Sequence, residues 1–430
     1  MVKRGVIFYF IVISVFILVS FLSFSACFFG EVKMVTEESG ELDDKLNYSG
    51  DKVNRPIIVY DRDGVILINK ELDSTVRITE EGGDGYPLIS PDGEKILFWR
   101  LVESSAAGLP RYELWSIGSD GRDQKKLLSP DDLPGEMGFA IDVEDEVMLD
   151  RLPFQVSWTA DSKTIIFNTL MEYGYGLLTN DDLWIVDVDT LDPQQLLPDG
   201  EGGSFALSPN EQYLFVADAQ SVSVLDFETL QREKLLEFPF VNTASEYAYV
   251  PQPVWSNDGT YGLIAIASPE PFTTEAYLSV WRLPITGEAE LISELPGLNL
   301  FNTMDDRLWS PDRDYLVYFD QGFCISSPDG RIVACYDADS FFGWSEDGLL
   351  FLFSRGNNLY LGDLDNDEQD LALPEGISME WLDAKWLDSR SFILLAGNYY
   401  DGLTLLYGNV EGKFIIVDHN VRSFDGVIAP

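Results

Sequence analysis

The stretch Ile89-Ser-Pro-Asp-Gly-Glu-Lys-Ile-Leu-Phe98 decides the fold, because variants of it recur along the chain. Each copy begins with an apolar or Trp residue, continues through a small polar turn and ends in a hydrophobic run. The lead residues are Ile89, Trp158, Leu207, Trp255, Trp309, Trp344 and Trp386, and the last copy is the least complete. Successive leads are 35 to 69 residues apart, about 50 on average. The chain is therefore built from repeats of one supersecondary unit.

Each repeat contains four short strand-like runs. In the second repeat they are residues 155–158, 164–168, 183–187 and 194–197, joined by turns rich in Asp, Asn, Gly and Pro. No segment after residue 54 has a helical period over three turns. Repeats of this length and strand content predict the blades of a β-propeller. A flat β-sandwich is the alternative, and seven recurrences of one lead argue against it.

The two ends of the repeat region predict how a ring would close. Residues 56–60, 65–69 and 75–79 are expected to be strands two to four of a blade that lacks its first strand, and residues 423–430 contain a Val-Ile-Ala run that can supply it. Such pairing removes two open sheet edges. The expected fold class is all-β, a propeller of four-stranded antiparallel blades closed by its N- and C-terminal strands. Eight blades are favoured, and seven is the alternative.

The repeats resemble those of a known family. The Trp-Ser-Pro-Asp-Gly type of lead and the stretch Leu114-Trp-Ser-Ile-Gly-Ser-Asp-Gly121 resemble the WD-repeat-like repeats of TolB-like propellers, which also occur in prolyl-oligopeptidase relatives. The resemblance covers nearly all of residues 55–430. It implies a binding platform, since the propeller of that family usually serves as one and many members have no assigned activity.

The N-terminal residues 1–26 have the pattern of an export signal peptide, with Lys3 and Arg4 before an apolar run. The 22-residue run is also long enough to be an uncleaved membrane anchor. Phe24-Ser-Ala-Cys27 resembles the bacterial lipoprotein cleavage box, although Phe stands where Leu is usual. This resemblance implies acylation of Cys27 and tethering at the outer face of the cytoplasmic membrane or in the cell envelope. Lys3 and Arg4 on the inner side agree with the positive-inside rule.

Residues 31–54 are polar and acidic, and we expect residues 27–54 to form a lipid-anchored flexible linker, followed by the propeller at residues 55–430. Two further cysteines, Cys324 and Cys335, flank the turn at Asp329-Gly330. A two-residue turn places them directly opposite each other on adjacent strands, where a disulfide fits, and export favours the bond. A three-residue turn would place them diagonally, and two buried thiols are the alternative.

The formal net charge of −45 argues against nucleic acid or anionic lipid as a partner. The sequence has one histidine, His419, and no Gly-x-Ser-x-Gly elbow, so neither a serine hydrolase triad nor a zinc site is expected. Asp363, Asp365 and Asp367 have the alternate spacing of a calcium loop, but the Gly and Glu that such a loop needs are missing. They are a weak metal candidate, and no cofactor is expected.

The loops of the predicted blades are unequal. Turns between strands one and two are short, whereas insertions fall between strands two and three or between blades, at residues 129–154, 171–182, 237–253, 267–277 and 294–302. These loops share one face of a propeller, which is often the binding face of a repeat protein. The aromatic residues expected there are Phe139, Tyr173, Tyr175, Phe238, Phe240, Tyr247, Tyr249, Phe272 and Phe301, joined by Tyr399 and Tyr400 from the last repeat.

Aromatic rings among carboxylates suit a protein or peptide partner, or stacking against a sugar. The first interpretation is a non-enzymatic scaffold in the cell envelope that presents this face to a protein or peptide. The alternative is a carbohydrate-binding or carbohydrate-cleaving propeller that uses the same face, since two opposed carboxylates need not be close in sequence.

Overall fold

The computed structural model describes residues 55–80, 82–104, 110–138, 146–173, 176–177, 182–244, 248–297, 305–398, 400 and 402–429. These residues form antiparallel β-sheets, and the described part of the chain contains no α-helix, only the 3-10 turn η2 (Asp306–Leu308). Accordingly, none of the residues in these ranges belongs to a helix able to span a bilayer. The all-β prediction is confirmed.

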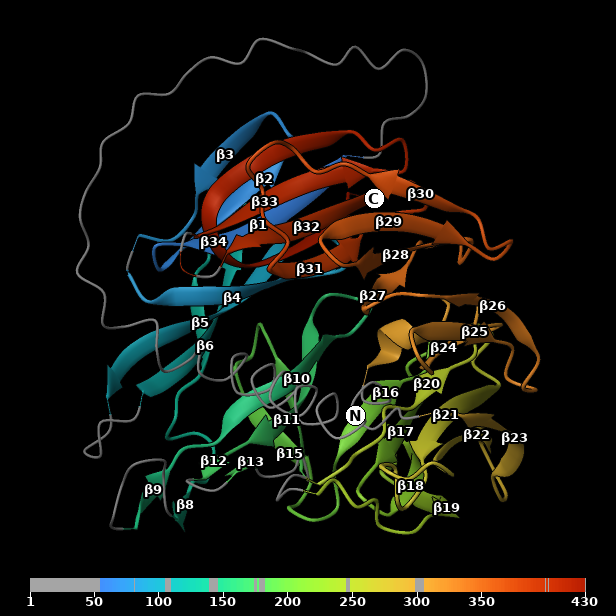
Figure 1. The fold of residues 1–430 in the computed structure, drawn as a ribbon. Coiled ribbons are helices and arrows are strands. Elements are labelled where there is room, and N and C mark those ends of the chain that lie inside the picture. The colour runs from blue at the N-terminus through green and yellow to red at the C-terminus, as the bar shows by residue number, and fades with distance from the viewer. Residues whose placement is uncertain are drawn as a thin grey trace.

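Most strands belong to four-stranded sheets that follow one another in chain order (Figure 1). Within the described ranges, five such sheets are β4 (Asp84–Ile89), β5 (Lys95–Ser104), β6 (Pro110–Gly118) and β7 (Lys125–Leu128); β10 (Leu152–Trp158), β11 (Thr164–Leu170), β14 (Leu183–Asp187) and β15 (Pro193–Leu197); β16 (Ser204–Leu207), β17 (Tyr213–Ala217), β18 (Ser221–Asp226) and β19 (Arg232–Glu237); β20 (Val254–Trp255), β21 (Tyr261–Ala267), β22 (Tyr277–Pro284) and β23 (Glu290–Pro296); and β27 (Ser340–Trp344), β28 (Leu350–Arg355), β29 (Asn358–Asp363) and β30 (Glu368–Leu371).

Three smaller units complete this part of the chain. They are the sheet β24 (Leu316–Phe319), β25 (Phe323–Ser326) and β26 (Ile332–Tyr336), and two inserted hairpins, β8 (Glu136–Gly138) with β9 (Val147–Leu149) and β12 (Glu172–Tyr173) with β13 (Gly176–Leu177). The three-stranded sheet departs from the expected four strands. Its lead residue Trp309 forms only an isolated bridge to Leu316, because the 3-10 turn η2 occupies the place of an inner strand.

The first and last parts of the described chain share a seven-stranded sheet. Its order is β3 (Ser74–Arg77), β2 (Val65–Lys70), β1 (Pro56–Arg62), β34 (Phe414–Ile428), β33 (Gly402–Asn409), β32 (Ser391–Asn398) and β31 (Trp381–Trp386). The first half of β34 pairs with β33 and the second half with β1, and both partners meet it at Val421. The preceding Asn420 has a left-handed φ of 57°, which bends the strand there. One strand of 15 residues therefore serves as an outer strand and then as an inner strand.

The recurring lead is a hydrogen-bonded turn. In the copy at Trp344, the Ser345 hydroxyl donates to Asp347 Oδ1 at 2.7 Å and accepts from the Leu350 amide at 2.9 Å, while Asp347 Oδ1 accepts from the Leu349 amide at 3.2 Å. The same pattern joins Ser90 to Asp92 and Ser310 to Asp312. These local bonds satisfy the backbone where the chain reverses. The repeated Ser and Asp side chains therefore serve to stabilise the turns.

The residue after the Asp or Asn adopts a left-handed φ in the six complete copies. From the second copy onward it contacts the turn of the preceding repeat. Gly93, Gly259 and Gly348 supply this conformation directly. Where another residue stands, its side chain reaches back: Ser162 Oγ accepts from the Asp92 amide at 3.2 Å, and Glu211 Oε1 accepts from the Ala160 amide at 2.6 Å. The lead turns thus contact one another and lie on one face of the molecule.

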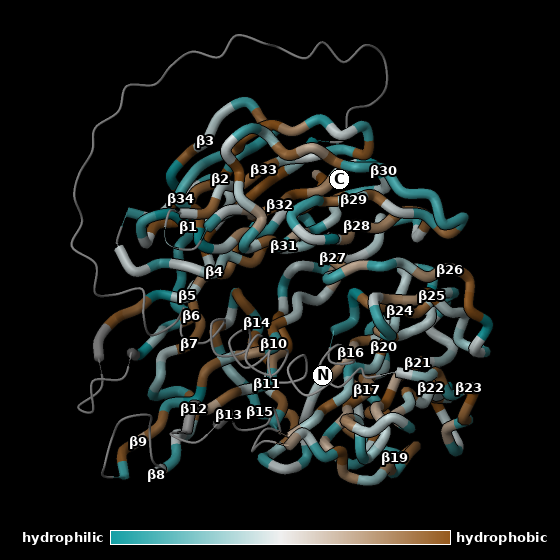
Figure 2. The backbone as a smooth tube through the Cα atoms, viewed as in Figure 1, coloured by the Kyte–Doolittle hydropathy of each residue, from teal (hydrophilic) through white to brown (hydrophobic). Residues whose placement is uncertain are grey.

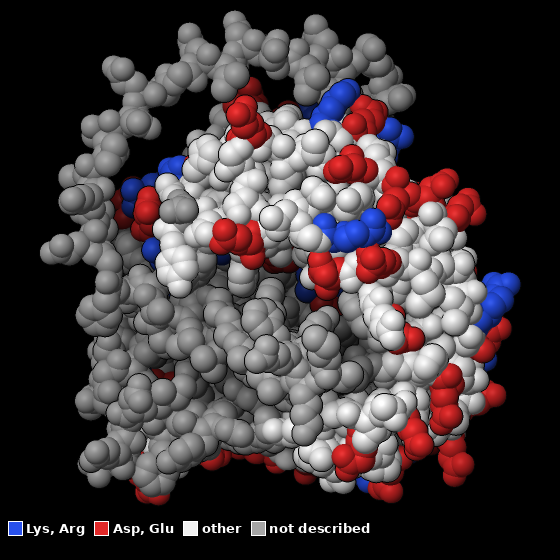
Figure 3. All heavy atoms as spheres, in the orientation of Figure 1, with Lys and Arg blue, Asp and Glu red and all other residues white. Residues whose placement is uncertain are grey.

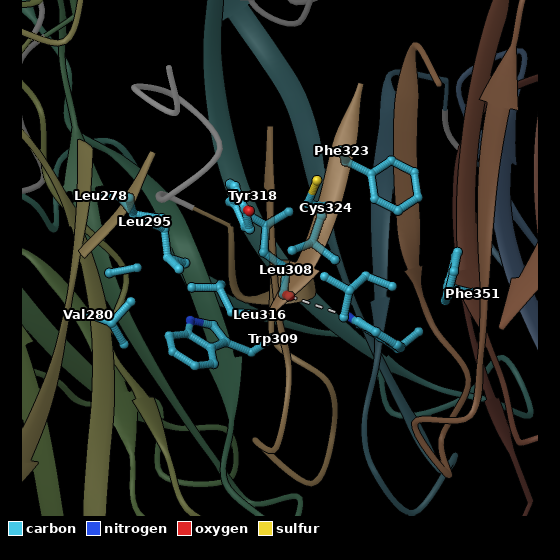
Figure 4. Close-up of a cluster of buried hydrophobic side chains, with 14 of the residues drawn as sticks. Leu278, Val280, Leu295, Leu308, Trp309, Leu316, Tyr318, Phe323, Cys324 and Phe351 are labelled. Carbon is cyan, nitrogen blue, oxygen red and sulfur yellow. Dashed lines mark hydrogen bonds between the residues drawn. The ribbon is translucent and has the colours of Figure 1, made fainter. Parts of the chain in front are cut away.

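The hydrophobic core lies between successive sheets. Figure 2 shows apolar residues concentrated on the strands, and each core cluster of the described residues combines side chains of neighbouring sheets. The largest, shown in Figure 4, places Trp309 beside Val280 of β22 and Phe323 5.8 Å from Phe351 of β28, measured between ring centroids. Another cluster joins Ile58 and Tyr60 of β1 to Leu395 of β32. The two parts of the seven-stranded sheet, β1–β3 and β31–β33, therefore pack against each other as neighbouring sheets do elsewhere.

Polar contacts accompany this junction. Asp418 of β34 accepts hydrogen bonds from Tyr60 Oη at 2.7 Å and from Arg62 at 2.6 Å. Asp425 accepts from the Ile89 amide of β4 at 2.9 Å and pairs with Lys385 of β31. One carboxylate thereby links β31, β34 and β4, three neighbouring inner strands that run in the same direction.

Cys324 and Cys335 form a disulfide between β25 and β26. They are direct cross-strand partners, although the turn is the longer one, with three residues between the hydrogen-bonded Ser327 and Arg331. The register shift needed by the longer turn falls between Ile325 and Ser326, on the turn side of the bond.

Candidate binding face

The insertions lie at the end of the sheets opposite the lead turns, because the strands are antiparallel. In the sheet of β20 to β23, Ala267 pairs with Leu278, so residues 268–276 leave at the end far from the lead turn at Ser256. The segment before β20 arrives at the same end. Since the lead turns share one face, the insertions share the other, which we call the insertion face.

The insertion before β10 is described at residues 129–138 and 146–151, and these parts are held by a buried arginine. The Arg151 side chain is 3% exposed and lies 3.0 Å from Asp182 Oδ2, and Asp182 is fully buried. Arg151 also contacts Asp199 at 2.5 Å and Glu136 at 3.0 Å. Asp182 accepts further bonds from the Trp184 indole at 2.8 Å and from Thr169. All these groups are paired, so this network fastens the loop and is not itself a reactive site.

A second network adds to the anchoring. Arg111 contacts Asp150 at 2.7 Å and Asp131 at 2.8 Å, and these carboxylates raise the pKa of its guanidinium. The hairpin formed by β8 and β9 lies in the sequence between Asp131 and Asp150, and Glu136 of β8 contacts Arg151. Its directly paired Met137 and Met148 are both exposed.

The exposed aromatic side chains of the described residues all belong to the insertion face. They lie in its loops or at the strand ends that open onto it, and they are Tyr86, Phe154, Phe240, Phe272, Tyr277 and Tyr400. Large apolar residues that are exposed elsewhere in the described chain are aliphatic, such as Leu191 and Leu230 near the opposite face. Aromatic rings in contact with water are typical of interaction surfaces.

Several rings named from the sequence are placed by the structure. Phe240 is 53% exposed, Phe272 38% and Tyr400 93%. The prediction for Phe238 and Tyr249 is wrong, because both are buried between β16–β19 and β20–β23. The Tyr249 hydroxyl accepts from the Ala267 amide at 3.0 Å and donates to the Ala265 carbonyl at 3.3 Å. These two rings anchor the loop that carries Phe240.

The remaining aromatic residues and Cys27 named from the sequence have no described side chain. Phe139, Tyr175, Tyr247, Phe301 and Tyr399 lie outside the described residues, as do Cys27 and the whole of residues 1–54. Tyr173 lies in β12, but its side chain is outside the description.

Tyr86, Phe154 and Tyr277 are the exposed rings that the sequence analysis did not name. Tyr86 follows Gly85 at a register shift in β4 and has a left-handed φ of 55°, which turns it out of the sheet. The Gly-Tyr-Pro sequence at 85–87 is the signal that could have indicated an interrupted strand.

The weak metal candidate serves another purpose. Asp363 Oδ1 accepts from the amides of Asp365 at 2.9 Å and Asp367 at 3.0 Å, so its carboxylate caps the turn between β29 and β30. Across the described residues, no group of three or more His, Cys, Asp and Glu side chains could hold a metal ion. His419 is exposed, and its Nδ1 lies 3.0 Å from the Thr404 hydroxyl oxygen.

A buried carboxyl lies where the inner strands begin. Asp61 of β1 is 3% exposed and accepts a hydrogen bond from Ser423 Oγ, which in turn accepts from the Tyr86 amide at 3.1 Å. Burial raises the pKa of Asp61 to about 6, against the opposing effects of the Ser423 bond and of Arg422.

The fold has known counterparts. The structure is similar to dipeptidyl peptidase 4 of Porphyromonas gingivalis, with a TM-score of 0.53 and 10% identity over 84% of this chain, which spans 57% of that protein. Weaker likenesses include the β-propeller domain of the Trilobed protease from Pyrococcus furiosus, at TM-score 0.47 and 11% identity over 78% of this chain and 95% of that one. TolB from Acinetobacter baumannii follows at TM-score 0.32 and 16% identity, over 66% and 63%.

The sequence itself matches no protein-family model and no curated protein. At these identities the structural likenesses concern the fold. The repeated antiparallel four-stranded sheets themselves make this chain a propeller-like all-β protein.

Proposed function

We propose that this chain is an eight-bladed, closed β-propeller that acts as a binding scaffold and holds a protein or peptide partner on its insertion face. The blade count follows from assigning the second half of β34 to β1–β3 and its first half to β31–β33. The observation that carries the binding role is the confinement of the exposed aromatic rings of the described residues to one face.

Two features support binding over catalysis. The charged groups best buried on the insertion face, Arg151 and Asp182, are fully engaged with each other and with backbone-anchoring partners. The sequence of this chain has no Gly-x-Ser-x-Gly elbow, the nucleophile motif of many serine hydrolases.

Photocrosslinking tests the choice of face. A photoreactive phenylalanine analogue placed at Phe240 or Tyr400 should crosslink the same partner protein in cells. The matched controls are Leu191 and Leu230, which are comparably exposed near the opposite face and should not crosslink it. Equal crosslinking from both faces, or none from the insertion face, would contradict the proposal. A glycan array with a reducing-sugar release assay separates this role from the carbohydrate alternative.

We further propose that the propeller is exported and held in the cell envelope by a lipid on Cys27. The support is the sequence Phe24-Ser-Ala-Cys27 after a charged and apolar leader. Metabolic labelling with a palmitate analogue should mark the wild-type protein and not Cys27→Ala. Labelling that persists in the variant would refute acylation at this residue.

A further inference from the structure

We infer that two adjoining loops on the insertion face form a recognition platform for the guanidinium groups of an arginine-bearing partner segment. The loops are residues 237–244 and 268–277, and we call them the platform. The inference rests on the proposed binding function and names the chemistry of the partner.

The two loops of the platform are hydrogen-bonded to each other and present aromatic rings. The Asn242 amide donates to the Pro269 carbonyl at 2.9 Å and Asn242 Nδ2 donates to Glu270 Oε2 at 3.2 Å, so the two loops lie side by side. Within the first loop, Phe238 and Val241 point into the core while Phe240 is exposed. Phe272 of the second loop is exposed as well. Binding to such a preformed surface requires little ordering of the loops.

The platform is also acidic and lacks any cation of its own. The sequence from Leu235 to Trp281 contains no Lys or Arg. Glu270 and Glu275 flank Phe272 in the sequence and are themselves exposed, whereas Glu237 is paired with Lys234 at 2.7 Å. Acidic groups are common over the visible surface in Figure 3. A cationic segment is therefore complementary in charge to this platform.

The interior of the same protein shows which cation this combination of rings and carboxylates binds. Arg100 lies 4.7 Å from the ring centroid of Trp115 and donates to both oxygens of Asp84, at 2.6 and 2.9 Å.

Arg355 repeats the arrangement. It lies 4.9 Å from the ring centroid of Tyr360 and donates to both oxygens of Glu368, at 3.0 and 2.7 Å. A planar guanidinium can stack on a ring and bind a carboxylate at once, whereas an ammonium cannot do both so well. The platform offers the same two groups to a partner.

Fluorescein-labelled octa-arginine and octa-lysine test the inference, with the purified full chain and fluorescence anisotropy at physiological ionic strength. Both peptides carry equal charge, so attraction to the acidic protein as a whole contributes equally. We expect the wild type to bind octa-arginine about two- to fivefold more tightly than octa-lysine, the size of one exposed cation–π contact. Phe240→Ala with Phe272→Ala should abolish the preference, and Phe240→Tyr with Phe272→Tyr should restore it.

The control variant Leu191→Ala with Leu230→Ala removes two exposed apolar side chains near the opposite face and should keep the preference. Circular dichroism melting confirms that the alanine variants fold. Equal affinity of the wild type for both peptides, or a preference that survives in the double alanine variant, would overturn the inference. If crosslinking from the insertion face still captures a partner in that case, the binding function stands and only the assignment of its chemistry fails.

Discussion

The pairing of β1 with β34 can be tested by the pH dependence of stability, through the buried Asp61 of β1. Its pKa in the folded protein is raised from 3.8 to about 6, chiefly by burial. The folded state therefore holds this proton more tightly than the unfolded state does. The stabilisation is fully present below about pH 4 and is lost as the pH rises through about 6. At about 1.4 kcal/mol per pH unit, the displacement corresponds to about 3 kcal/mol at neutral pH.

Asp61→Asn removes the titration while preserving an acceptor for Ser423 Oγ. We expect the variant to be more stable than the wild type by about 2 to 3 kcal/mol at neutral pH. The difference should shrink toward zero near pH 4, where the wild-type carboxyl is protonated. Urea unfolding followed by tryptophan fluorescence at several pH values measures it.

A carboxylate of opposite behaviour provides the control. The pKa of Asp226 is lowered by hydrogen bonds from Thr229, so its ionised form favours folding. Asp226→Asn should therefore destabilise the protein at neutral pH and change it little in acid. A stability difference for Asp61→Asn that does not vary with pH would refute the assignment of a raised pKa to this residue.

Three further substitutions test other parts of the structure. Ser345→Ala breaks a buried lead turn and should cost about 1 to 3 kcal/mol in urea unfolding, and a loss below about 0.5 would show that the turn is not essential. Arg151→Ala leaves Asp182 buried without its cation, so we expect a loss of about 3 to 5 kcal/mol and faster cleavage of residues 129–150 by a glutamate-specific protease. Unchanged cleavage would mean that the insertion is held by other contacts. Replacing Cys324 and Cys335 together by Ser opens a link across 11 residues and should lower stability by about 2 to 3 kcal/mol. Calorimetry should then give one melting temperature with and without reductant, while the wild type melts lower with reductant.

The sequence predicted the strands best where the decisive chemistry is local. The lead turn depends on Ser and Asp side chains that bond to amides within five residues, as Ser345 does, so its signature survives in the sequence. Leu183–Asp187 was predicted to the residue for the same reason, since turn residues flank it on both sides. The all-β class and the four-strand repeat followed from these turns.

The binding face could be predicted only in part. Phe238 and Phe240 are two residues apart and chemically identical, yet one is buried and the other exposed. Their difference depends on Ile264 and Ile266 of the next sheet, which local sequence does not place. The continuity of β34 was missed because the bend at Asn420 resembles a loop between two strands. The Arg151 network was missed because its partners come from three separate loops.

The position of β34 has a consequence for biosynthesis. Residues 56–62 are made early, and one edge of β1 stays unpaired until residues 421–428 leave the ribosome. Contacts between such distant segments form slowly, and an unpaired edge invites association with other chains. A holding chaperone in the compartment where the protein matures would shield that edge, and a ribosome stalled before Val421 would yield a product prone to aggregate.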